Sequence, residues 1–167
     1  MDSYLLKLQH AIASATSGMT DEELTRHPEA KWNAAQVLEH LYLSYVGTVK
    51  GCERCLKENR PFTRAQTLKD RLSVAIVVTL GYMPTGRQAP EVARPRGLPC
   101  DEVTKGIGPQ IAAMDTLLTR CEEHFGKRAK FMAHPILGPL NAAQWRKLHW
   151  VHGQHHLKQI SQLRSNV

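Results

Sequence analysis

The stretch that most constrains the fold is the histidine-rich segment 141–164, which has the periodicity of one long helix and contains no proline. Asn141 and Gln144 have the spacing of a helix N-cap and its capping box. A helix of this length would be roughly 35 Å long, enough to span a small domain. Its inward face is expected to carry seven residues: Trp145, Leu148, His152, His156, Gln159, Ile160 and Leu163.

Two histidines lie within this apolar face. His152 and His156 are at i and i+4, so their imidazoles are neighbours on the helix surface and both can reach one metal ion. A buried ring needs a partner for its polar nitrogen, and a shared metal would supply one for both. The pattern is a weak motif without a neighbouring glutamate, so hydrogen-bonded core histidines are the alternative. His149 and His155 lie about 60° to either side of His152, away from the centre of the face.

Helical periodicity also covers residues 4–17, 32–58, 63–82 and 101–125. Asn33-Ala-Ala-Gln36 opens the second of these segments with the same four letters that open 141–164, which indicates one N-cap solution used twice. Residues 74–79 are rich in β-branched side chains, so a strand is the alternative there. Gly106, Gly108 and Pro109 predict a kink or restart within 101–125. The sequence predicts a single all-α domain, 1–167, built as a four-helix bundle.

A proline-rich stretch, residues 83–100, interrupts the helical pattern. We expect an ordered crossover loop over one end of the bundle, because long loops inside compact domains are usually functional or disordered. Its arginines, Arg87, Arg94 and Arg96, are candidates for the mouth of a site that takes an anion. Solvated surface is the alternative.

The formal net charge is +7, but the basic residues are scattered, so we expect no nucleic-acid partner. No apolar stretch has transmembrane length, and the N-terminus reads as an amphipathic helix rather than a signal peptide. We therefore expect no membrane partner and a cytoplasmic location. Cys52 and Cys55 form a CxxC within a helical pattern, where ordinary packing is favoured over redox chemistry.

Three segments resemble the DinB-like superfamily. Residues 31–41 carry a tryptophan that opens a helix and an inward His40, residues 152–160 carry the HxxxH pair, and His134-Pro135 with Gly138 resembles a connector of one branch of the group. The resemblance implies a four-helix bundle, often dimeric, with a divalent metal such as zinc or nickel. The metal ligands would be His40, His152 and His156. Asn33 stands where the superfamily usually has serine, but both residues cap helices.

The resemblance implies a metal-dependent enzyme, either a hydrolase or a transferase that uses a low-molecular-weight thiol, acting on a small molecule. Three protein nitrogens would leave a coordination position open, as in catalytic sites. His149, His155 and His134 are candidates for roles around the metal. The alternative is a non-catalytic binding or stress-response protein in which the metal is structural or absent.

Trp150 and Leu157 are expected on the back of the last helix, opposite the histidines. Two large apolar groups on an otherwise polar face predict a homodimer through this surface, with packing against the proline-rich loop as the alternative.

Overall fold

The computed structural model describes residues 1–26, 31–84, 86 and 88–165. The protein is mostly helical, as predicted for an all-α class. The elements follow in the order α1 (Ser3–Thr16), α2 (Asp21–Thr25), α3 (Ala34–Lys57), α4 (Leu68–Val74), a π-helical segment η1 (Ala75–Thr79), a 3-10 turn η2 (Glu91–Ala93), α5 (Cys100–Phe125), β1 (Met132–His134), β2 (Gly138–Leu140) and α6 (Ala142–Ser165).

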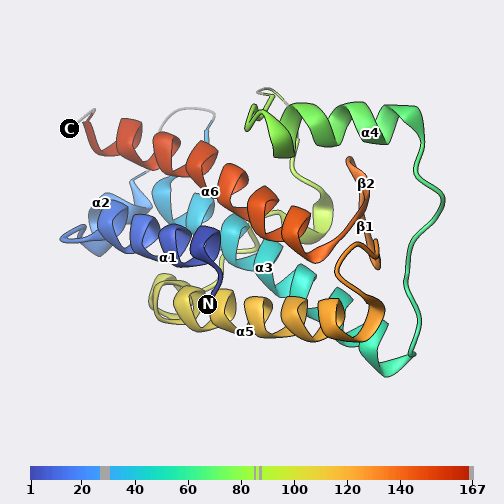
Figure 1. Ribbon diagram of the computed structural model, residues 1–167. Helices are drawn as coiled ribbons and strands as arrows, with labels where there is room; N and C mark the ends of the chain where they lie inside the picture. Colours follow the sequence, from blue (N-terminus) through green and yellow to red (C-terminus); the bar gives the residue numbers. More distant parts are fainter. Residues whose placement is uncertain (27–30, 85, 87, 166–167) are drawn as a thin grey trace.

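Four long helices, α1, α3, α5 and α6, pack around a common core (Figure 1). The most extensive contacts are those of α3 with α5 and of α1 with α6, and α3 also contacts α6. Large side chains from all four helices are fully buried between them: Leu5, Leu8, Leu41, Tyr45, Ile111, Met114, Leu118 and Ile160. The contact between α3 and α6 is the one that positions the histidines described below.

The two predicted capping boxes form as expected. The Oδ1 atoms of Asn33 and Asn141 accept from the backbone N–H groups of Gln36 and Gln144, at 2.8 and 2.9 Å. The Oε1 atom of each glutamine in turn accepts from the backbone N–H of its asparagine, at 3.0 and 3.1 Å. These caps fix where α3 and α6 begin, and therefore which residues face the interior.

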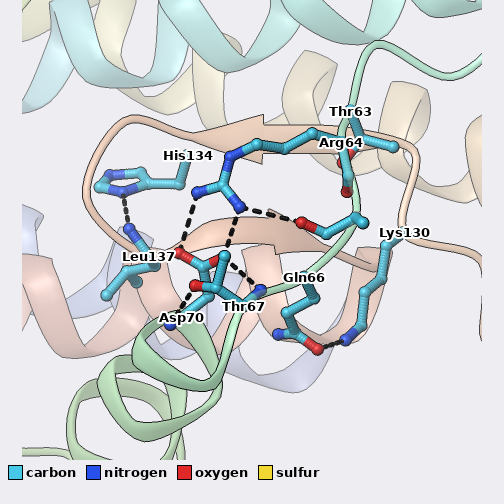
Figure 2. A network of polar contacts seen from close by, with 9 residues as sticks. Thr63, Arg64, Gln66, Thr67, Asp70, Lys130, His134 and Leu137 are labelled. Carbon is cyan, nitrogen blue, oxygen red and sulfur yellow. Dashed lines mark hydrogen bonds and ion pairs between the residues drawn. The ribbon is translucent and has the colours of Figure 1, made fainter.

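Residues 63–82 do not form the single helix predicted. The helix begins only at Leu68, because Thr67 and Asp70 form a capping box there. Arg64, in the extended segment before it, binds the Asp70 carboxylate through both terminal nitrogens (Figure 2) and lowers the pKa of that carboxyl. The β-branched stretch is the π-helical segment η1 rather than a strand. Helix α5 is continuous through Pro109, so the restart predicted there is absent, and the alternative of a kink stays a prediction.

The connector before α6 is a short antiparallel hairpin, β1 and β2, which the sequence did not predict. Gly138 has φ +70°, and a Cβ there would lie 2.5 Å from Cγ of Asp70. Glycine is therefore required at this close approach. The hairpin holds His134 beside the start of α6.

The surface predicted for dimerisation is not free. Leu157 is 7% exposed, and Trp150 is partly buried against the core. They share one face of α6 with Gly153, where a Cβ would overlap Leu8 of α1. Helix α1 therefore covers this face, which removes the argument for a homodimer through Trp150. The homodimer itself stays a prediction.

Within the described ranges, no helix has both the length and the apolar character needed to span a membrane.

Candidate metal centre

His40 lies in the second turn of α3, and a distant segment of the chain fixes its ring. Its Nδ1 lies 2.7 Å from the carbonyl oxygen of Ala93 in η2. A carbonyl oxygen only accepts, so Nδ1–H is the donor and Nε2 keeps its lone pair. The ring also packs against Trp32, with 5.2 Å between ring centroids. His40 is thus held with its metal-binding nitrogen directed toward α6.

His152 and His156 complete a triad from α6. Nδ1 of His156 lies 2.8 Å from Oε1 of Gln159, so this ring also donates through Nδ1 and keeps a lone pair on Nε2. Nε2 of His152 lies 3.1 Å from Nε2 of His40 and 3.0 Å from Nε2 of His156. One nitrogen from each of the three rings lies within 4.8 Å of the other two. The structure therefore brings together the three histidines predicted as ligands.

The protons of the triad show that a cation fits between the rings. Because His40 and His156 carry their protons on Nδ1, the three Nε2 atoms share at most one proton, on His152. That proton satisfies one neighbouring lone pair and leaves the other facing it without a donor. A metal ion would satisfy all three. Three imidazoles suit zinc, nickel, iron or copper and leave a coordination position open.

Burial keeps these rings neutral. Desolvation lowers the pKa of His40, lowers that of His152 well below its usual value, and lowers that of His156 to about 4. The positive charge that each ring would place on the others adds to the effect for His152 and His156. At neutral pH the three lone pairs are therefore available without competition from protons.

The triad opens onto a cavity of about 890 Å³. Its lining comes from α3, η1, the proline-rich loop, the β1–β2 hairpin and α6, and includes all three histidines. Most of the lining side chains are apolar, among them Trp32, Val77, Met83, Leu148 and Leu163. A volume of this size is within the usual range of small-molecule sites, roughly 300–1,000 Å³.

Residues 6–163 match a family model described as a protein of unknown function, DUF1569. The chain belongs to the DUF1569 family. No curated protein and no solved structure gives a significant match. The triad and every residue that lines the cavity lie within the part of this DUF1569 chain that matches the model.

His149 and His155 lie on either side of the triad in this DUF1569 chain. His149 is buried, with Nε2 2.9 Å from Oγ1 of Thr48 and its ring packed between Tyr45 and Trp145. His155 is partly exposed, and its ring centroid lies 5.1 Å from that of His156. His155 is therefore the closer of the two to the open side of the site.

His134 lines the same cavity from β1. Its ring packs against Trp145, with 5.6 Å between centroids, rather than joining the triad. Its Nδ1 accepts from the backbone N–H groups of Ile136 and Leu137, both at 3.2 Å. Figure 2 shows the bond from Leu137. The ring is therefore fixed by the hairpin turn and not by the metal ligands.

Two of the three arginines predicted at the mouth, Arg94 and Arg96, lie elsewhere. Arg94 and Arg96 do not line the cavity. The guanidinium of Arg94 donates to the carbonyl of Ala89 and to the side chain of Gln88, and that of Arg96 donates to the carbonyl of Val92. Both side chains therefore donate to other residues of the loop itself. Arg87 lies outside the described residues.

Three groups that hold the triad were missed by sequence reasoning. The contact of Gln159 with His156 could have been predicted, because the two residues are three positions apart on the same helix face. No sequence pattern indicated that the carbonyl of Ala93 would bond to His40. Glu39, the residue before His40 in the chain, was not predicted to have a role. It is buried and accepts from the backbone N–H groups of Arg96 and Gly97, at 2.6 and 3.1 Å.

Glu39→Gln should weaken metal binding about tenfold, as changes behind a ligand typically do. An amide oxygen holds the two loop N–H groups less strongly than a carboxylate, so the carbonyl of Ala93 would orient His40 less firmly. Competition with a chelator of known affinity measures the change. Glu53→Gln, an exposed position on the same helix, is the matched control. Equal metal affinity in the two variants would contradict this role for Glu39.

Proposed function

We propose that this protein is a metal-dependent enzyme that acts on a small molecule, with His40, His152 and His156 as ligands of a divalent metal and with the four long helices forming a DinB-like four-helix bundle. The observation that carries the proposal is the convergence of three ring nitrogens at one side of a ligand-sized cavity. Zinc and nickel are the leading candidates for the metal.

When bound, a divalent metal supplies Lewis acidity that activates water or a thiol at neutral pH. The residues of the chain orient the ligands and shape the space around them. Ala93 and Gln159 hold the rings of His40 and His156, and the apolar walls limit the access of water. These roles serve a hydrolase and a transferase of low-molecular-weight thiols equally, and we retain both.

His155 is the candidate for moving a proton. It lines the cavity, its ring lies beside that of His156, and burial lowers its pKa, so it is neutral at pH 7 and can accept a proton. Among the described residues, the cavity lining includes no Asp or Glu. A reaction at this site would therefore use an imidazole rather than a carboxylate as its base.

The alternative is a binding protein in which the metal only joins α3 to α6. Structural metal sites are usually closed by four protein ligands. Here the triad provides three and borders a large cavity, an arrangement that favours a reacting or binding role at the fourth position.

Elemental analysis of protein purified without a His-tag should find about one zinc or nickel ion per chain, because three converging neutral imidazoles form a single site. The loaded and metal-free proteins should then be compared on a panel of neutral esters and amides and in thiol transfer. Turnover that requires the metal supports the enzyme. A stable chain that carries no metal and takes up none when it is offered would refute the proposal.

A further inference from the structure

The walls of the cavity restrict the charge of its ligand. Of the described residues that line it, only Lys31 carries a full charge at neutral pH, and that side chain is exposed. Arg94 and Arg96 bind the loop instead. Away from the triad, a charged group in this cavity would lose its hydration without gaining an opposite charge from the described residues. The ligand that fits the walls is neutral and largely apolar.

One wall nevertheless offers a hydrogen bond. Since Nδ1 of His134 accepts from two backbone N–H groups, its proton must be on Nε2. This Nε2–H has no acceptor among the described residues, although His134 lines the cavity. The hairpin turn thus holds an N–H donor at the cavity wall, and no described residue supplies an acceptor for it.

Two neighbours of His134 also have polar atoms that lack a hydrogen-bond partner among the described residues. The indole Nε1–H of Trp145 and Nδ1 of His149 are buried with no hydrogen-bond partner in the described part of the chain. Both residues line the cavity and are at least nine-tenths buried. Their rings stack on each other, with 5.8 Å between centroids, and Trp145 contacts His134. Buried polar groups normally find partners, so this cluster marks a region where a ligand supplies them.

We propose that the cavity binds a neutral, largely apolar molecule that carries a hydrogen-bond acceptor oxygen, such as that of a ketone, ester or amide, and that Nε2–H of His134 holds this oxygen. His134 is thereby a specificity-determining residue. The inference rests on the proposed function only for the reacting end of the ligand, which would lie at the triad. The subsite itself needs no metal.

A pair of fluorescent probes tests this subsite. The first is 6-propionyl-2-(dimethylamino)naphthalene, a neutral aromatic molecule with one carbonyl oxygen, and the second carries a propyl group in place of the propionyl group. Binding to the full chain is measured with and without zinc. The carbonyl probe should bind the wild-type protein about tenfold more tightly than the propyl probe, the effect of one hydrogen bond.

Two substitutions at His134 separate its two hydrogen-bonding atoms. In His134→Asn, the amide oxygen replaces Nδ1 and keeps the turn, but no group reaches the position of Nε2. This variant should bind the carbonyl probe about tenfold more weakly than wild type and the propyl probe equally well. Its melting temperature should be close to that of wild type. In His134→Gln, the amide N–H reaches the position of Nε2 and should restore most of the affinity for the carbonyl probe.

Emission gives a second readout, because loss of the hydrogen bond to its carbonyl shifts the emission of the first probe to shorter wavelength in His134→Asn. Equal affinity of the wild-type protein for the two probes, or equal losses for both in His134→Asn, would overturn the role of His134. Tighter binding of a naphthalene sulfonate of similar size would overturn the neutral class of ligand. If the probes bind as expected but the protein binds no metal, the subsite at His134 is supported and only the proposed metal-dependent enzyme is refuted.

Discussion

Alanine at His40, His152 or His156 should abolish stoichiometric metal binding. Each ring supplies one of three nitrogens that converge within 4.8 Å, and two imidazoles alone hold a divalent ion far more weakly than three. We expect the metal content after dialysis to fall from about one ion per chain to near zero, and the affinity to fall by on the order of 100-fold or more. Elemental analysis and chelator competition measure both quantities.

The same helix provides the controls. His155→Ala should keep the metal, since the ring of His155 lies beside His156 and outside the triad. His149→Ala should weaken binding by at most about tenfold, because His149 bonds to Thr48 and not to the ligands. Full metal occupancy in the His156→Ala variant would contradict the assignment of the ligands.

The metal-free protein should lose stability steeply as the pH falls from 6.5 toward 4. Burial lowers the pKa of His149 to about 3 and that of His156 to about 4, and it also lowers that of His40. In the unfolded chain these groups titrate near 6.5, so at intermediate pH the unfolded state binds more protons than the folded state. Stability is therefore complete above about pH 6.5 and falls as the pH is lowered through this window.

The loss should reach several kcal/mol, since each pKa unit corresponds to about 1.4 kcal/mol per group. Urea unfolding of the chelator-treated protein at a series of pH values measures it. Carboxylates affect stability at lower pH. Arg64 lowers the pKa of Asp70, so this ion pair is lost only in stronger acid. His149→Gln can still bond to Thr48 but cannot become charged, and it should reduce the proton uptake on unfolding by up to about one. A free energy of unfolding that is the same at pH 7 and pH 5 would contradict this account.

The sequence by itself determined the features that depend on residues a few positions apart. The capping boxes at Asn33 and Asn141 follow from a spacing of three residues, and the facing imidazoles of His152 and His156 follow from a spacing of four. Local hydrogen bonds and helix geometry are enough to predict these arrangements. The resemblance of the segment around Trp32 to the DinB-like superfamily predicted His40 as the third ligand.

Only the tertiary structure decided what surrounds the triad. The carbonyl of Ala93 reaches His40 across 53 residues of sequence, and Glu39 reaches Arg96 across 57. Such pairs arise from how a loop lies over a helix, and no periodicity encodes them. Arg94 and Arg96 of that loop were wrongly predicted at the cavity for the same reason, because their guanidinium groups donate to nearby groups of the loop.

The apolar line on the back of α6 shows the same division. The sequence predicted a homodimer through Trp150 and Leu157, with packing against the proline-rich loop as the alternative, and it did not indicate that α1 lies on this face. The close fit of Leu8 against Gly153 shows that α1 packs on this face. Such packing partners are selected by the shapes of two surfaces and not by either one alone.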